Sequence, residues 1–250
     1  MSKFKKTVSH ILTKAVGYIA TFPHRFRKNR VQKPPTISHI KWEEYLLKKF
    51  DKEGMKVLEV GSRNVTGSPY GKRFKKAQYT GFDFYDGDNV DLVGDAHKLS
   101  SYFKEGEQFD LIFSSAVFEH LHMPWVVAIE IQKLLKVGGY VFVETHFSFA
   151  AHERPWNFFQ FSDMGLRALF STALGFELIE KGMSNPIAGY YTHESEKYMR
   201  FRPLTELYCH SEILCRKTHE PSSFSWDEVH LDDIVDGSRY PEGTTKYKGV

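Results

Sequence analysis

Short apolar segments that alternate with helical segments constrain the fold of this chain more than any other feature. Five of them are read as strands, at Lys56–Val60, Tyr79–Phe82, Val90–Val93, Phe109–Ser114 and Tyr140–Glu144. Helical patterns lie around Trp125–Leu135 and Ser162–Ala173, and Gly138-Gly139 supplies a turn before the fifth strand. Apolar strands separated by helices are typical of a parallel sheet covered on both faces. The sequence therefore predicts an α/β, doubly wound fold.

The segments on either side extend this domain. A helix is expected over Ser38–Phe50, with Ser38 as its cap. Two late strands are expected at Phe176–Glu180 and Glu206–Arg216, separated by an irregular aromatic insert, Asn185–Pro203. We divide the chain into a basic amphipathic extension at 1–33, the main domain at 34–218, and an acidic, weakly ordered tail at 219–250.

The extension carries most of the positive charge. Residues 1–33 hold nine Lys or Arg and no Asp or Glu, so the remainder has 34 − 9 = 25 basic against 31 acidic residues, a net charge of −6. A body of this charge argues against a nucleic-acid partner. The pattern over residues 3–30 combines these charges with an apolar stripe, and Pro23 is expected to end or kink the helix. Such a helix either lies on an anionic membrane surface or folds back on the acidic body.

Cysteine content and hydropathy indicate the compartment. Cys209 and Cys215 lie six residues apart on one expected strand, about 20 Å along it, so they cannot form a disulfide with each other. No run of 18 apolar residues is present, and the N-terminus lacks a secretory signal pattern. We expect reduced thiols and a cytoplasmic protein, with peripheral membrane contact as the open alternative.

Polar residues follow each predicted strand at the edge where open parallel sheets bind ligands. Gly61 follows the first strand, and Asp83 follows the second about twenty residues later, where a carboxylate accepts hydrogen bonds from ribose hydroxyls. Asp95 follows the third strand, where a carboxylate can accept from an adenine amino group. Ser114 and Ser115 begin the small-residue loop after the fourth strand.

This series resembles the class I S-adenosylmethionine-dependent methyltransferases, chiefly through Glu119-His120-Leu121 after the fourth strand and Lys136-Val137-Gly138-Gly139 before the fifth. The resemblance implies a mostly parallel, seven-stranded sheet with helices on both faces and its last strand antiparallel. It also implies S-adenosylmethionine as cofactor, held at the methionine part by Glu59 and Gly61, at the ribose by Asp83, at the adenine by Asp95 and Ala96, and near the sulfonium by Ser114 or Ser115. Arg63 replaces the usual second glycine of the first loop, either pairing with the methionine carboxylate or facing solvent.

The segment after the fifth strand is expected to lie over the methyl group. Its residues 144–162 combine two histidines, an arginine and six aromatic side chains. Either this run is a lid packed by aromatics, or His152 or His146 deprotonates a hydroxyl acceptor. We assign acceptor binding to four further residues, which are Arg154, Trp156, Tyr190 and Tyr191.

The acceptor and any metal are less constrained. The run also resembles methyltransferases associated with sugars and surface glycans, so a glycan hydroxyl is the expected acceptor and another small metabolite the alternative. No metal site is predicted, because the closely spaced pair, His120 and His122, lies in a loop and no other pair has the spacing of helical metal ligands. A transient divalent ion on a sugar diol is the minor alternative.

Two other classes of protein compete with this assignment. A Rossmann dehydrogenase would have a fuller glycine motif than Gly61 and Gly67. A non-catalytic protein on the same fold is the second, because a fold does not fix a function. Binding of S-adenosylhomocysteine separates the enzyme from a scaffold that has lost the cofactor.

Overall fold

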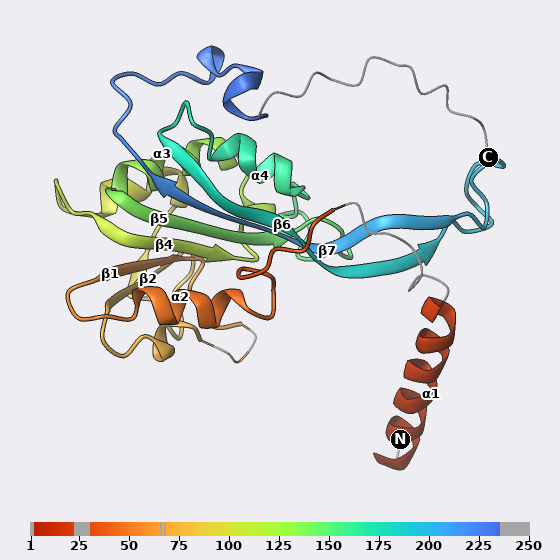
Figure 1. Ribbon diagram of the computed structural model, residues 1–250. Helices are drawn as coiled ribbons and strands as arrows, with labels where there is room; N and C mark the ends of the chain where they lie inside the picture. The colour runs from red at the N-terminus through yellow and green to blue at the C-terminus, as the bar shows by residue number, and fades with distance from the viewer. Residues whose placement is uncertain (1–2, 23–30, 66, 68, 236–250) are drawn as a thin grey trace.

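The computed structural model describes residues 3–22, 31–65, 67 and 69–235, and within these ranges it contains one seven-stranded sheet (Figure 1). The strand order is β3-β2-β1-β4-β5-β7-β6. β7 pairs antiparallel with both β5 and β6, whereas the pairs among β1 to β5 are parallel. The strands are β1 (Lys56–Val60), β2 (Gln78–Asp83), β3 (Leu92–Val93), β4 (Phe109–Ser115), β5 (Leu135–His146), β6 (Phe176–Tyr190) and β7 (Pro203–Lys217). The predicted sheet, with its antiparallel last strand, is confirmed.

Helices cover both faces of this sheet. Figure 1 shows α2 (Trp42–Phe50) on one face and α3 (Pro124–Leu134) with α4 (Asp163–Leu169) on the other. α1 (Lys3–Thr21) precedes them, and residues 23–30, which the predicted N-terminal helix also includes, lie outside the described residues. Short 3₁₀ turns complete the described part: η2 (Gly71–Arg73), η3 (Ala96–Tyr102), η4 (Phe118–His120), η5 (Trp226–Glu228) and η6 (Leu231–Asp233).

Two apolar clusters, one on each face, bury the sheet. The smaller joins Trp42, Leu46 and Phe50 of α2 to apolar side chains of β1, β4, β5 and β7. The larger joins β1, β4 and β5 to α3 and α4. Because both faces are covered, the strands read as nearly continuous apolar runs, which is the pattern that predicted them.

Two predicted boundaries differ from the structure. The helix expected from Ser38 begins at Trp42, because the backbone carbonyl of Ser38 already accepts the amides of Lys41 and Trp42 in a turn. β5 begins at Leu135, before the predicted glycine turn. Its pairing with β4 shifts register between Leu135 and Tyr140, so the glycines form an irregularity within the strand.

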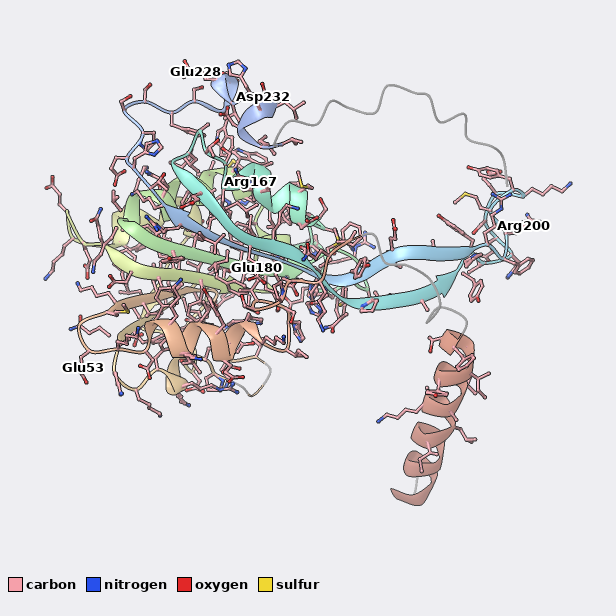
Figure 2. The ribbon with its side chains drawn as sticks, viewed as in Figure 1. Glu53, Arg167, Glu180, Arg200, Glu228 and Asp232 are labelled. Atoms are coloured by element: carbon pink, nitrogen blue, oxygen red, sulfur yellow. The ribbon has the colours of Figure 1, made fainter. Side chains whose placement is uncertain are left out.

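The closing hairpin differs most from the prediction. β6 and β7 each span 15 residues, and they take in residues 185–190 and 203 of the segment expected to be irregular. Figure 1 shows this pair extending beyond the rest of the sheet, and Figure 2 places Arg200 at its outer end. The two strands satisfy each other's backbone groups there, so the extension needs no third strand.

Three smaller points follow from the sequence expectations. Cys209 and Cys215 are both free, as predicted. Among the described residues, no helix has the length and apolar character of a membrane-crossing segment. Residues 219–235 of the predicted tail carry two short 3₁₀ turns, and Phe224 packs against the larger core; residues 236–250 lie outside the described residues.

Candidate active site

A glycine turn after β1 opens the cofactor end of the sheet. Gly61 has a φ of +87°, in the left-handed region that favours glycine, and a Cβ at this position would overlap the side chain of Val117. Its backbone N–H donates to the carbonyl of Phe82 at 2.8 Å, which ties the ends of β1 and β2 together. A side chain therefore cannot replace the hydrogen of Gly61 without moving the β4 loop.

Acidic side chains lie at the ends of β2 and β3. The Asp83 carboxylate accepts the backbone N–H groups of Arg63 and Tyr85, each at 3.0 Å. The Asp95 carboxylate accepts the backbone N–H of His97 at 3.0 Å and lies 2.7 Å from its Nδ1. Each carboxylate offers about four acceptor positions, so both retain capacity for a ligand. Nε of Arg63 lies 3.7 Å from Oδ1 of Asp83, so the arginine side chain is directed toward this carboxylate.

Glu59 is buried on β1 rather than open at its end. Its carboxylate accepts the hydroxyl of Tyr79 and faces the amide of Asn89 at 3.4 Å. Burial raises the pKa of Glu59 to about 8, although the hydrogen bonds from Tyr79 and Asn89 act in the opposite direction. A protonated Glu59 is thus a stable state of this site near neutral pH.

The two serines after β4 have different partners. Ser114 is buried and donates to the carbonyl of Val60 at 2.8 Å, which joins β4 to β1. Ser115 donates to Oε1 of Glu144 at 3.2 Å. Oε2 of Glu144 lies 3.0 Å from Nδ1 of His39, so a line of polar contacts leads from the β4 loop across β5.

His39 belongs to a segment that crosses the sheet, which we call the N-terminal strap (residues 31–41). The strap is bonded to β6 through the Thr36 amide and hydroxyl, which donate to the Glu180 carboxylate, labelled in Figure 2. Its His39 ring stacks on His210 of β7 with 4.0 Å between ring centroids. Hydrogen bonding to Glu144, opposed by burial, raises the pKa of His39, whereas burial and the neighbouring imidazoles lower that of His210 to about 4.

Glu119 and His146 form the buried centre of the site. Oε1 of Glu119 lies 2.7 Å from Nδ1 of His146, while its Oε2 accepts the Thr145 hydroxyl at 2.6 Å. The Glu119 side chain is fully buried. Burial acts to raise its pKa, but the imidazole of His146 and the Thr145 hydroxyl outweigh that effect, so the pKa of Glu119 is lowered.

Two further histidines surround this pair. The ring of His152 lies 5.3 Å from that of His146 and 4.9 Å from that of His120, centroid to centroid. Nε2 of His120 lies 3.9 Å from Oε1 of Glu119. The structure thus brings His146 and His152, both predicted from the sequence, to one carboxylate and adds a third imidazole.

The loop after β5 is anchored to the same residues. The backbone amides of Phe158 and Phe159 donate to the carbonyl of Glu119, and that of Phe161 donates to the carbonyl of His146. Trp156 is 59% exposed and Phe149 47% exposed, so both present apolar faces to solvent beside the histidines. Arg154 is exposed on the same loop. Its position and that of Trp156 suit a role at the acceptor side.

Tyr190 and Tyr191 are not brought to this centre. In the sheet, His146 of β5 lies opposite His210 of β7, and His210 lies opposite Ser184 of β6. Tyr190 follows Ser184 by six residues, about 20 Å farther along the strand. The two tyrosines therefore lie on the projecting hairpin, and a role for them in acceptor binding requires an acceptor that reaches along it.

Several site residues carried no assignment from the sequence. From the sequence, Glu119 appears only in a family motif, and His120 only in that motif and in its short spacing to His122. No site role was assigned to His39, Glu144 or His210. Their roles depend on the β5–β7 register, which sets His146 opposite His210, and on the course of the strap. A signal was present in Glu119-His120, two ionisable residues that directly follow a buried strand and its loop.

Comparison with known proteins identifies the family of this chain. A family model described as a methyltransferase domain matches residues 29–180, which is more than half of the chain. No curated protein matches the sequence.

Solved structures share the fold at low sequence identity. A protein from Bacillus halodurans is 13% identical with a TM-score of 0.51, over 71% of this chain and 99% of that chain. TehB from Haemophilus influenzae is 17% identical with a TM-score of 0.44, over 71% and 67% of the two chains. A 1,6-didemethyltoxoflavin-N1-methyltransferase from Burkholderia thailandensis, solved with 1,6-didemethyltoxoflavin and S-adenosylhomocysteine, is 12% identical with a TM-score of 0.49, over 88% and 92%.

Proposed function

Because this chain belongs to the class I S-adenosylmethionine-dependent methyltransferases, we propose that it methylates a hydroxyl group, and that this hydroxyl belongs to a sugar of a cell-surface glycan or its precursor. The methyl donor is S-adenosylmethionine. The finer statements, that the acceptor atom is oxygen and that the acceptor is a sugar, are argued from the side chains around Glu119.

The cofactor end accommodates the donor. Gly61 turns the backbone sharply at the end of β1, where a side chain would overlap Val117, and the carboxylates of Asp83 and Asp95 lie at the ends of adjacent strands, where the ribose and adenine of the donor are expected. Among the described residues, the buried hydroxyl of Ser62 next to Gly61 has no hydrogen-bond partner. A polar ligand at this turn would supply one.

One observation carries the choice of a hydroxyl: three imidazoles surround a buried carboxylate at the ends of β4 and β5. His146, His152 and His120 offer ring nitrogens beside Glu119. A sulfonium methyl group reacts readily with good nucleophiles, but a neutral hydroxyl needs to lose its proton as it attacks. An acceptor such as a thiolate or an amine would need less help of this kind.

The reaction balances with these groups. An oxygen lone pair of the acceptor forms a bond to the methyl carbon, and the carbon–sulfur bond breaks with its electron pair remaining on sulfur. The hydroxyl proton passes to the cluster that contains His146 and His152, and from there to solvent. The products are a methyl ether and neutral S-adenosylhomocysteine, so the positive charge of the sulfonium leaves as the proton.

The exposed aromatic side chains support a sugar as the acceptor. Trp156, Phe149 and Phe158 remain 59%, 47% and 44% exposed beside the cluster. Such rings bury the apolar C–H face of a flat ligand, while nearby polar groups hold its hydroxyls. This combination of flat apolar surface and hydrogen-bonding groups matches the two faces of a pyranose.

The test is methyl transfer by the full chain to a glycan extract, read as a mass increase of about 14 Da (one CH₂ group) per acceptor. The O-methyl product is distinguished from a methyl ester by its resistance to mild base. His146→Gln and His152→Gln are expected to lose about 10²–10⁴ in turnover with unchanged S-adenosylhomocysteine affinity. His193→Gln, which alters an exposed histidine on the hairpin, is the matched control.

Two results would contradict the proposal. Tight S-adenosylhomocysteine binding without transfer to any hydroxyl compound would point to a non-catalytic or differently directed protein. A loss of less than about tenfold in both histidine variants would assign transfer to proximity alone.

A further inference from the structure

The cluster around Glu119 has the composition and orientation of a metal site. We propose that Glu119, His146 and His152 bind a divalent transition-metal ion, with His120 positioned as a fourth ligand. This inference concerns the cluster used by the proposed function, but metal binding is measured without any acceptor. Side chains that offer one ligand atom each from the first three residues lie within 4.8 Å of one another.

The first observation is a pair of buried atoms that face each other without bonding. Oε1 of Glu119 and Nδ1 of His146 are 2.7 Å apart, yet within the described part of the chain neither has a hydrogen-bond partner of acceptable geometry. Both side chains are at least nine-tenths buried. An unsatisfied buried polar atom is costly, and two aimed at one place indicate a missing shared partner.

The second observation concerns the neighbouring imidazoles. Nδ1 of His120 lies 2.9 Å from the carbonyl oxygen of Trp156, and Nδ1 of His152 lies 3.0 Å from that of Ala150. A carbonyl can only accept, so each Nδ1 carries the proton and each Nε2 keeps its lone pair. Metal-binding histidines are held in this way, with one ring N–H donated to a backbone carbonyl.

The carboxylate is oriented in the same manner. The Thr145 hydroxyl donates to Oε2 of Glu119 at 2.6 Å, so only Oε1 remains for a ligand. Oε1 is the atom that faces His146 and lies 3.9 Å from Nε2 of His120. Oε2 of Glu119 is therefore bonded to Thr145, and Oε1 faces the proposed metal site.

The donor set selects the class of cation. Imidazole nitrogens with one carboxylate oxygen suit Zn²⁺, Fe²⁺ and related ions, whereas Mg²⁺ and Ca²⁺ prefer an all-oxygen shell. Zinc bonds of about 2.0–2.1 Å place tetrahedral ligands about 3.4 Å apart. Oε1 of Glu119 and Nδ1 of His146, which are 2.7 Å apart, would therefore separate slightly, while the His152 nitrogen would move inward from within 4.8 Å. His152 lies on the β5–α4 loop, where that inward shift requires little movement of the core.

Two neighbouring groups of ligand atoms are less suited. One consists of His39, Glu144 and His210, and there the two imidazoles stack face to face while Glu144 already faces His39 and Ser115. The other consists of His146, Cys209 and His210, whose Cys209 Sγ lies 3.8 Å from the ring of the adjacent His210. These two groups lack the carbonyl-oriented imidazoles found around Glu119.

A cation at this place would serve the proposed reaction. Bound to the acceptor oxygen, it would stabilise the alkoxide that forms as the hydroxyl proton leaves, and would take this task from a free imidazole. The inference in this form rests on the proposed function, and the binding of the cation itself does not.

The experiment is a calorimetric titration of the full chain with Zn²⁺ after removal of bound metal by a chelator. We expect one equivalent per chain. Thr145→Val keeps the side-chain shape, removes the donor to Glu119, and is expected to weaken Zn²⁺ binding about 10- to 100-fold. His152→Ala, on the loop, and Glu119→Gln, checked for folding by circular dichroism, remove ligands and are expected to weaken it by about 100-fold or more.

Matched controls separate the alternatives. His193→Ala is expected to leave Zn²⁺ affinity unchanged, and Co²⁺ in place of Zn²⁺ is expected to show no thiolate charge-transfer absorption. Equal Zn²⁺ affinity in the unaltered chain, Thr145→Val and His152→Ala would overturn the site. A loss of Zn²⁺ affinity that occurs only in His210→Ala and Cys209→Ser would also overturn the site. If the chain binds Zn²⁺ but transfers no methyl group to hydroxyl compounds, the metal site is supported and the proposed function is wrong. If the chain shows full turnover without binding Zn²⁺, the proposed function is supported and the metal site is wrong.

Discussion

Substitution of Asp83 tests the proposed cofactor site most directly. Its carboxylate accepts the amides of Arg63 and Tyr85, and is expected to accept the two ribose hydroxyls of the donor. Asp83→Ala should weaken S-adenosylhomocysteine binding by tens-fold or more in calorimetry, because charge-assisted hydrogen bonds contribute about 1.5–3 kcal/mol each. Asp88→Ala, an exposed carboxylate bonded to Lys72 beside the same loop, is the control. Unchanged affinity in Asp83→Ala would make Asp83 a turn residue only.

Glu59 is expected to make the stability of the folded chain depend on pH. Burial raises its pKa to about 8 from an ordinary 4.5, despite hydrogen bonds from Tyr79 and Asn89. Between about pH 6.5 and 8 the folded chain therefore holds a proton that the unfolded chain has lost, so stability falls as pH rises through this window. Below it, the lowered pKa of His210 gives the opposite slope, because the unfolded imidazole binds a proton that the folded one does not.

Glu59→Gln should remove one part of this pH dependence. Urea unfolding of both proteins across that window is expected to give a slope that is shallower in the variant by up to about 1.4 kcal/mol per pH unit. Because His39 and Glu212 also have raised pKa values, some slope should remain in Glu59→Gln. Parallel pH profiles of the two proteins would show that Glu59 is ionised in the folded state.

Residue assignments from the sequence were most informative where a residue follows a strand. Gly61, Asp83 and His146 all lie at strand ends, and the alternation of strands and helices locates such ends. The functions of Glu119 and His210 could not be derived that way. They depend on which strands become neighbours and in what register, and a single sequence does not specify either.

At the scale of elements, helix α1 exposes apolar side chains that a binding partner would cover. Its apolar side chains remain exposed along the helix, including Ile11, Leu12, Val16 and Ile19 at 60–71%. Residues 1–33 carry nine Lys or Arg and no acidic residue. We propose that this helix lies on an anionic membrane surface, where an apolar stripe inserts and each basic residue near the surface contributes about 1 kcal/mol.

The membrane proposal is tested by co-sedimentation of the full chain with anionic and neutral vesicles. Binding is expected to favour anionic vesicles and to weaken with salt. The double variant Val16→Ser and Ile19→Ser keeps every charge and removes two exposed apolar side chains, so it should bind less at any salt concentration. Salt-independent binding, or equal binding by the unaltered chain and the variant, would overturn the proposal.

Other elements show how much of the secondary structure a sequence pattern predicts. The first five strands were predicted to within a few residues, apart from the early start of β5 at Leu135, and β1, β4 and β5 among them are buried on both faces. The long hairpin was underestimated. Beyond the pairing of Ser184 with His210 the two strands leave the sheet, and Pro186, Gly189 and Pro203 interrupt their apolar residues, so no continuous apolar run marks them. Their pairing with each other holds that part in extended form.

At the scale of the whole molecule, charge divides the chain into two parts. The basic extension carries the net positive charge, and the remainder, with its net −6, carries the sheet and the site. The fold class followed from the strand–helix pattern alone. The identity of the acceptor did not, because it depends on the loop after β5 and the strap, whose course over the sheet is fixed by contacts far apart in sequence, such as His39 with Glu144.

The position of β7 has a consequence for biosynthesis. β7 is the last strand to leave the ribosome, yet it lies between β5 and β6. Until residues 203–217 are available, β5 and β6 each have an inner edge whose backbone groups await a partner, and His210 and Glu212 are absent from the site. A nascent chain can assemble the donor-binding half before β7 is made, but the acceptor half only after residues 203–217 have emerged. Exposed strand edges attract other chains, so this interval is when the growing protein has most need of chaperones.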